Sequence, residues 1–127
     1  MQDNIKRHDW GYEITWAQTQ EYTGKVIVFE KPAKSDIVFH NNTTKSYFVN
    51  QGKFSFKWID TKDGKVYENN LGEGGTTTVK KLVPYSIECV SATGSLSEVN
   101  NGELQEDVHI VLPAKNLGEN NVSTINR

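Results

Sequence analysis

The chain has few of the side chains that carry out covalent, redox or metal chemistry. It holds one cysteine, Cys89, and three histidines among 127 residues. A single cysteine excludes an internal disulfide and a multi-cysteine zinc site. No basic residue stands beside Cys89 to activate its thiol, so we expect a small core residue there. The run Gly72–Gly75 is not followed by Gly-Lys-Ser/Thr, and we read it as a turn and not as a phosphate-binding loop.

Length and charge narrow the class of protein further. We expect residues 1–112 to form a single domain with an N-terminal arm, and residues 113–127 to be a polar C-terminal extension. The 14 Lys and Arg residues are scattered and the net charge is −2, which argues against nucleic-acid binding, because such proteins gather a basic surplus on one face. The first residues contain no apolar run, so we expect no signal peptide, no membrane contact and a cytoplasmic location.

Strand signals dominate the sequence. Short runs rich in Val, Ile, Thr and aromatic residues are separated by turns of Gly, Asn, Asp and Pro, and no window keeps the spacing of an amphipathic helix. Evenly spaced short strands with glycine-rich turns indicate an antiparallel sandwich or barrel. The predicted strands are Tyr12–Trp16, Lys25–Phe29, Asp36–Phe39, Ser46–Val49, Phe54–Ile59, Thr76–Val79, Ser86–Val90 and Val108–Leu112.

Two hairpins are predicted from the turn residues. The first joins Ser46–Val49 to Phe54–Ile59 through Asn50–Gly52. Alternation places the three aromatic rings of its second strand on one face, which we expect to be buried. The second hairpin turns at Asp60–Gly64 and returns through residues 65–67.

Three segments carry a resemblance to a known family. They are Trp10-Gly11-Tyr12-Glu13, Tyr22-x-Gly24-Lys25-Val26 and the stretch from His40 to Gly52. In order and spacing they resemble the small cupins, and most closely the cupin domain of mannose-6-phosphate isomerase-type (sugar-phosphate) proteins, over residues 6–112. The resemblance implies an all-β antiparallel jelly roll, the double-stranded β-helix barrel of cupins. It also implies a homodimer, because the leading arm in this family often packs across a partner.

The resemblance puts unusual residue types at the family's metal-ligand positions. His40 and Asn42 stand at the His-x-His positions, and Lys45 stands at the glutamate. Tyr85 stands at the histidine that ends the later Pro-x-Gly-x-x-His motif. Lysine has no acceptor for a divalent metal, and amide oxygens and phenols are weak partners for zinc or iron compared with imidazole and carboxylate. The other two histidines do not rebuild a ligand set, so we expect no metal and no other cofactor.

The same positions imply a pocket for a small ligand. An imidazole, an amide, an ammonium and a phenol at the barrel mouth suit hydrogen bonds to a sugar or a sugar phosphate. The ammonium of Lys45 would pair with a phosphate or carboxylate as a point charge. The expected ligand-binding residues are His40, Asn42, Lys45, Tyr47 and Tyr85.

Two other functions stay open at this point. In the first, the protein is a metal-independent sugar isomerase or epimerase in which His40 and Tyr85 act as general acid and base. In the second, it is a structural or interaction protein whose barrel is filled by aromatic side chains, namely Tyr47, Tyr85, Phe54 and Trp58. Each candidate also has a plain structural interpretation: His40 satisfied by a neighbour, Lys45 solvated at a strand start, and Tyr85 in the core.

Overall fold

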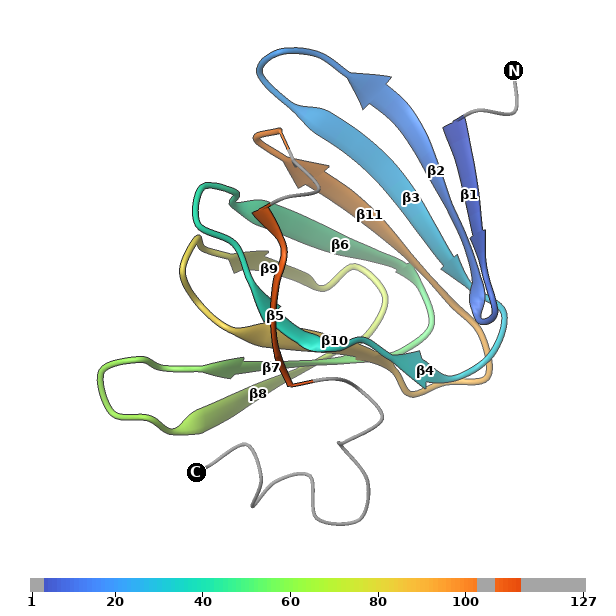
Figure 1. The fold of residues 1–127 in the computed structure, drawn as a ribbon. Helices are drawn as coiled ribbons and strands as arrows, with labels where there is room; N and C mark the ends of the chain where they lie inside the picture. Colours follow the sequence, from blue (N-terminus) through green and yellow to red (C-terminus); the bar gives the residue numbers. More distant parts are fainter. Residues whose placement is uncertain (1–3, 103–106, 113–127) are drawn as a thin grey trace.

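The computed structural model describes residues 4–102 and 107–112, which form two antiparallel sheets (Figure 1). The first sheet contains, in spatial order, β1 (Ile5–His8), β2 (Gly11–Gln18), β3 (Thr23–Phe29), β11 (Gly94–Asn100), β6 (Lys45–Gln51) and β9 (Thr76–Val79). The second contains β12 (His109–Leu112), β5 (Ile37–Phe39), β10 (Tyr85–Cys89), β7 (Phe54–Ile59) and β8 (Val66–Leu71), with β4 (Ala33–Lys34) also paired to β10. From β8 to β12 consecutive strands alternate between the two sheets. Two facing antiparallel sheets joined by such crossings confirm the predicted jelly roll. The predicted extension at 113–127 lies outside the described residues.

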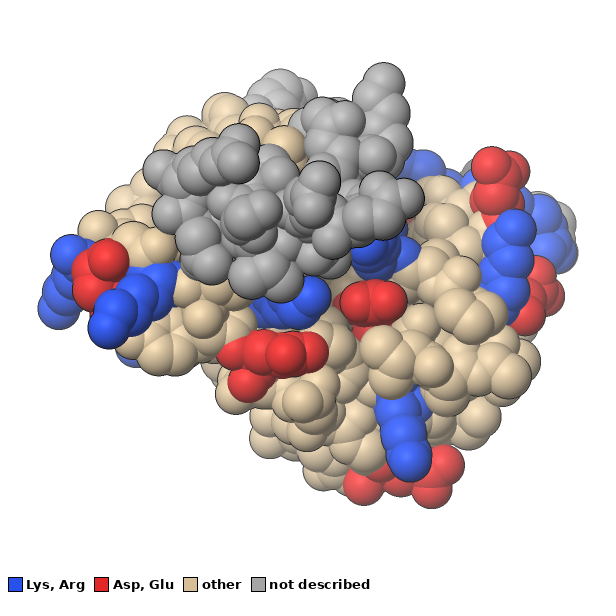
Figure 2. All heavy atoms as spheres, turned by 90° about the horizontal axis from the view of Figure 1, so that it is seen from below, with Lys and Arg blue, Asp and Glu red and all other residues tan. Residues whose placement is uncertain are grey.

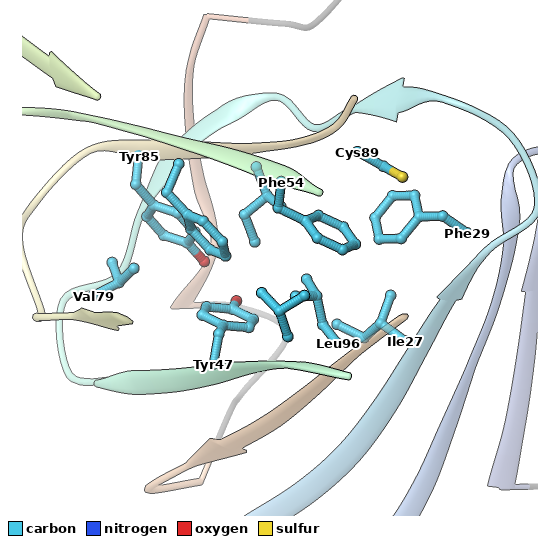
Figure 3. Close-up of a cluster of buried hydrophobic side chains, with 11 residues drawn as sticks. Ile27, Phe29, Tyr47, Phe54, Val79, Tyr85, Cys89 and Leu96 are labelled. Atoms are coloured by element: carbon cyan, nitrogen blue, oxygen red, sulfur yellow. The ribbon is translucent and has the colours of Figure 1, made fainter. Parts of the chain in front are cut away.

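The core lies between the two sheets. On β6, Tyr47 and Val49 are buried, and on β7, Phe54 and Phe56 are buried. Figure 3 shows Tyr47 and Phe54 pointing into the space between the sheets from opposite sides, and the rings of Tyr47 and Phe56 have centroids 5.2 Å apart. Cys89 is fully buried, as predicted for a small core residue. The core consists of Ile27, Phe29, Tyr47, Val49, Phe54, Phe56, Val79, Tyr85, Ile87, Cys89 and Leu96.

The first predicted hairpin is wrong. β6 pairs with β11 and β9 in the first sheet, whereas β7 pairs with β10 and β8 in the second. The chain crosses from one sheet to the other at Gly52, which has φ 91° and where a Cβ would lie 2.5 Å from the backbone oxygen of Thr93. The physical reason is that both strands carry large apolar side chains on one face, and placing them in facing sheets buries each face against the other.

The second predicted hairpin is confirmed. β7 and β8 are antiparallel neighbours, and Asp60 N donates to Lys65 O at 3.0 Å across the turn. The Tyr67 hydroxyl donates to the Asp63 carboxylate at 2.7 Å. The Tyr67 ring also stacks on Trp58, with centroids 4.8 Å apart, so this hairpin carries an aromatic pair on its inner face.

β11 is a central strand that the sequence patterns miss. It pairs with β3 on one side and β6 on the other. The residues that it turns toward the second sheet are Gly94, Leu96, Glu98 and Asn100, all of them buried. Only Leu96 is a large apolar residue, so alternation of apolar and polar side chains gave no strand signal here. The short strands β1 and β4 are also absent from the predicted set.

The surface carries mixed charges. On the face shown in Figure 2, groups of Lys and Arg are interspersed with Asp and Glu, in agreement with the scattered charges of the sequence. Within the described part of the chain, no helix has the length and apolar character needed to cross a bilayer.

Candidate ligand-binding site

Strand register brings polar side chains together on the inner face of the first sheet. Glu98 of β11 lies opposite Lys25 of β3 and Tyr47 of β6. Two residues along the strand, Asn100 lies opposite Lys45 of β6. Residues directly opposite one another project from the same face of a sheet. These five side chains therefore face the second sheet from one end of the first.

Glu98 is the centre of this polar layer, and its exposed fraction is only 2%. Its Oε2 accepts a hydrogen bond from Asn100 Nδ2 at 2.7 Å and lies 3.6 Å from Nζ of the buried Lys45. The backbone N of Gly102 donates to Asn100 Oδ1 at 2.9 Å, which orients the amide. A buried charge is costly unless it is paired and hydrogen-bonded. Lys45 and Asn100 thus keep the Glu98 carboxylate inside the barrel.

A second charged group stands on β2 and β3. Glu13 accepts from Lys25 Nζ at 3.3 Å through Oε1 and lies 2.6 Å from His8 Nε2 through Oε2. The His8 ring stacks on Trp10 with centroids 4.4 Å apart, and Trp10 stacks on Phe29 with centroids 4.5 Å apart. The N-terminal strands thereby place an aromatic ring, a carboxylate and an ammonium beside the barrel interior.

A cavity of about 200 Å³ lies where these groups meet, and we call it the inner cavity. Its lining includes three lysines, two glutamates and two aromatic residues that carry a polar group, Trp10 and Tyr47. Most of the other lining residues are apolar. A concave site with a few converging polar groups is the usual form of a small-molecule site. The inner cavity is lined by Trp10, Glu13, Lys25, Ile27, Phe29, Ala33, Lys34, Ser35, Lys45, Tyr47, Ile87, Leu96 and Glu98.

His40 and Tyr85 form a buried hydrogen-bonded pair. His40 Nε2 lies 2.9 Å from the Tyr85 hydroxyl, and His40 Nδ1 lies 3.1 Å from the backbone oxygen of Asp107. A carbonyl oxygen only accepts, so Nδ1 carries a proton. In the neutral imidazole Nε2 is then the acceptor of the Tyr85 proton. The backbone of His40 is held by a further hydrogen bond, in which Leu82 N donates to His40 O at 2.6 Å.

The buried residue Asp107 joins the chain before β12 to the loop after β5. Its carboxylate accepts from the backbone N–H groups of Asn41 at 2.8 Å and Asn42 at 3.0 Å, and from the Thr43 hydroxyl at 2.9 Å. Burial by itself raises the pKa of this carboxyl, but the two N–H groups, the hydroxyl and the neighbouring His40 ring lower the pKa below its ordinary value. The charged carboxylate therefore holds the loop in place.

A second cavity, of about 300 Å³, opens between β7, β8, β9 and β10, and we call it the edge cavity. Trp58 and Tyr85 supply aromatic walls. Tyr47, Phe54 and Tyr85 belong to the hydrophobic core, and Trp58 packs against that core. The edge cavity is lined by Phe56, Lys57, Trp58, Asn69, Thr77, Thr78, Val79, Lys80, Val83 and Tyr85.

Neither the inner cavity nor the edge cavity is lined by all five of the predicted ligand-binding residues. Lys45 and Tyr47 line the inner cavity, whereas Tyr85 lines the edge cavity. His40 lines neither of these two cavities and reaches only Tyr85 and backbone in the hydrogen bonds given above. Asn42 is exposed in the loop after β5 and lines neither cavity.

Trp10, Glu13, Lys25 and Glu98 line the inner cavity but were not among the predicted ligand-binding residues. Trp10, Glu13 and Lys25 belong to the two N-terminal motifs that carry the family resemblance, so those motifs were the available signal. Glu98 lies on β11, which the patterns miss, so nothing in the sequence placed its carboxylate inside the barrel.

The residues at the family's metal positions do not fit a metal. In the part of the chain that the structure describes, no three His, Cys, Asp or Glu side chains are grouped to share an ion. His40 uses both ring nitrogens, for Tyr85 and for Asp107, and Lys45 pairs with Glu98. An ammonium in that place supplies no lone pair to a cation. We therefore derive no metal chemistry for this chain.

Comparison with known proteins supports the fold. No family model matches the chain, and no curated protein matches it in sequence. The capsular polysaccharide assembling protein CapF from Staphylococcus aureus matches with a TM-score of 0.77 and 13% identity, over 85% of this chain and 31% of that chain. Oxalate decarboxylase from Bacillus subtilis matches with a TM-score of 0.73 and 15% identity, over 84% of this chain and 29% of that chain.

These matches concern the fold alone, because the identities are low. The chain spans about a third of the length of the structures that it matches. Both neighbours contain cupin domains, and the two facing antiparallel sheets agree with theirs, so this chain has the cupin fold. The finer resemblance to mannose-6-phosphate isomerase-type proteins stays a prediction.

Proposed function

We propose that this cupin-domain protein binds a small polar ligand, a sugar or a sugar phosphate, in the inner cavity. The observation that carries the proposal is the convergence of Lys45, Glu98 and Lys25 on one cavity that is also lined by Trp10. Charged groups are expensive to bury, and a chain keeps them inside its core where they serve a site.

Each group of the cavity has a counterpart in such a ligand. Lysine ammonium groups donate to phosphate, carboxylate or hydroxyl oxygens, and carboxylates accept from hydroxyl groups. The ring of Trp10 offers an apolar face to the carbon side of a sugar ring. One structural neighbour, CapF, is described as a capsular polysaccharide assembling protein, which agrees with a sugar-derived ligand.

The proposal is tested by a thermal-shift screen followed by calorimetry. The panel contains sugar phosphates, nucleotide sugars and small carboxylates. A ligand at one hundred times its dissociation constant adds about 2.7 kcal/mol to the stability of the protein, a shift of several degrees. A panel without any shift contradicts the proposal and favours the filled-barrel interpretation.

Paired lysine variants locate the site of any hit. Lys45→Met removes the buried ammonium, and we expect it to weaken binding roughly tenfold or more, as for a lost hydrogen bond to a charged group. Lys62→Met removes an exposed lysine of the β7–β8 turn and should leave binding unchanged. Tyr47→Phe, which removes only a hydroxyl at the cavity, repeats the test should Lys45→Met fold poorly. Equal binding by all variants would place the ligand elsewhere.

A second candidate is a metal-independent sugar isomerase or epimerase. The observation that favours it is the hydrogen bond between Tyr85 and His40, because a histidine that accepts a phenol proton can move a proton through that phenol. Tyr85 lines the edge cavity, so in this alternative the substrate occupies that cavity. Tyr85→Phe should then abolish turnover of an active sugar, whereas Tyr22→Phe, at an exposed tyrosine, should retain it. Full turnover by Tyr85→Phe removes the pair from the mechanism.

A further inference from the structure

One oxygen of the buried Glu98 carboxylate is left for a ligand. Both of its protein contacts, with Asn100 and with Lys45, involve Oε2. Oε1 accepts no hydrogen bond from any residue that the structure describes. Among those residues, every side-chain oxygen or nitrogen that is sealed from solvent has a hydrogen-bond partner. Oε1 therefore has some surface open to solvent, and because Glu98 lines the inner cavity, we infer that this surface faces that cavity.

We propose that Glu98 selects the ligand by accepting a hydrogen bond from one of its hydroxyl groups. This inference rests on the proposed binding function and narrows its ligand to a hydroxylated ring that carries one anionic group, such as a sugar acid or a sugar phosphate. A carboxylate can only accept hydrogen bonds, so the ligand atom at Oε1 must be a donor. Anions that only accept, such as sulfate, are disfavoured at this position.

The charges around the cavity decide between a hydroxyl and an ammonium as the donor. Three lysines and two glutamates line it, and Lys45 already pairs with Glu98. A cationic ligand would approach the three lysine ammonium groups in a partly desolvated site, where like charges repel strongly. A neutral hydroxyl group can donate to Glu98 without this repulsion between like charges. An anionic substituent on the same ring can pair with a lysine of the cavity.

The experiment compares two ring carboxylates that differ in their hydroxyl groups. Glucuronate and cyclohexanecarboxylate are titrated into the full chain by calorimetry, with sulfate as the anion that only accepts. A hydrogen bond to a charged group predicts that glucuronate binds roughly 10- to 100-fold more tightly than cyclohexanecarboxylate. Glu98→Gln should reduce this ratio to near one. Glu30→Gln makes the same chemical change at an exposed position and should keep the ratio.

The outcomes separate this inference from the proposed function. Equal binding of glucuronate and cyclohexanecarboxylate to the unaltered chain overturns the role of Glu98 and leaves ligand binding in place. An unchanged ratio in Glu98→Gln overturns it as well. Binding of neither ring, nor of any compound of the wider panel, overturns the proposed function itself. Should Glu98→Gln fail to fold because Lys45 loses its partner, the ratio measured on the unaltered chain decides.

Discussion

Leu82 has a backbone conformation that suits glycine. Its φ is 69°, and it is the one non-glycine residue with a positive φ in the described part of the chain. The motif Pro-x-Gly-x-x-His places a glycine three residues before its histidine, and Leu82 stands three residues before Tyr85. In that alignment Leu82 occupies the glycine position, and its backbone has a conformation that glycine adopts readily.

Leu82→Gly should stabilise the protein. The left-handed conformation costs a residue with a Cβ about 1–2 kcal/mol. Glycine adds roughly 0.5–1 kcal/mol of entropy cost on folding, so the net gain is up to about 1.5 kcal/mol. Leu82 is 54% exposed, so little packing is lost. Urea unfolding measures the change, with the exposed neighbour in Lys81→Gly as a control that should lose stability. Equal losses of stability in Leu82→Gly and Lys81→Gly would contradict backbone strain at Leu82.

Single residues also set the limit of what the sequence predicts about the site. His40, Lys45 and Tyr85 were selected by their places in family motifs, and all three are buried inside the barrel. Their partners were out of reach, because a pairing such as Lys45 with Glu98 depends on which strands lie side by side. Asn42 shows the converse: it occupies a motif position, yet its loop turns outward and only its backbone is held.

The corner between β6 and β7 is the element that the sequence patterns interpret wrongly. Asn50–Gly52 has the composition of a hairpin turn, and local patterns do not distinguish a turn within a sheet from a crossing between sheets. Most other strands were predicted because Val, Ile and aromatic residues recur at every second position. β11 was missed because its inner face is mostly polar or glycine.

Gly52→Ala should destabilise this corner by about 1–3 kcal/mol, the usual cost of a backbone held in a sparsely populated region. Its φ of 91° is unfavourable for alanine, and a Cβ would lie 2.5 Å from Thr93 O. Thermal unfolding measures the loss. Gly72→Ala is the matched control, because a Cβ there meets no atom within 4 Å. If both variants unfold at the same temperature, the crossing is not constrained as described.

The contact of Asp107 with the loop after β5 should make stability depend on pH. The folded-state pKa of this carboxyl lies below its ordinary value of 3.8, because the hydrogen bonds that it accepts outweigh its burial. Its contribution is therefore present above about pH 4 and is lost as pH falls toward the folded-state pKa. The melting temperature of the protein should fall more steeply below pH 4 than that of Asp107→Asn.

The control for this pH profile is Asp9→Asn, which alters an exposed aspartate on the turn between β1 and β2. It should keep the steep profile of the unaltered protein. Parallel profiles for the protein and Asp107→Asn would show that the loop is held by its other contacts, such as the bond from Leu82 N to His40 O.

At the scale of the whole molecule, the barrel interior has two halves of different character. One end holds Phe54 and Cys89, which are packed with almost no exposed surface. The other end holds a buried ion pair, Lys45 with Glu98. Replacing a buried ion pair by apolar residues of similar size is often neutral or stabilising, whereas removing one partner is strongly destabilising. Stability alone therefore gives no reason to keep the polar end, whereas the proposed binding function would require it.

This interpretation predicts opposite effects on stability and binding. Lys45→Met alone leaves the buried Glu98 carboxylate without its cationic partner. This change should lower the free energy of unfolding by about 3–5 kcal/mol. The double variant Lys45→Met/Glu98→Leu removes both charges and should recover most of that loss, yet should bind none of the ligands of the unaltered protein. Urea unfolding and calorimetry on the same samples measure both effects. Because the double variant keeps the volume of the core but lacks its polar groups, recovered stability without binding assigns those groups to the ligand. A double variant as unstable as the single one assigns them to the fold instead.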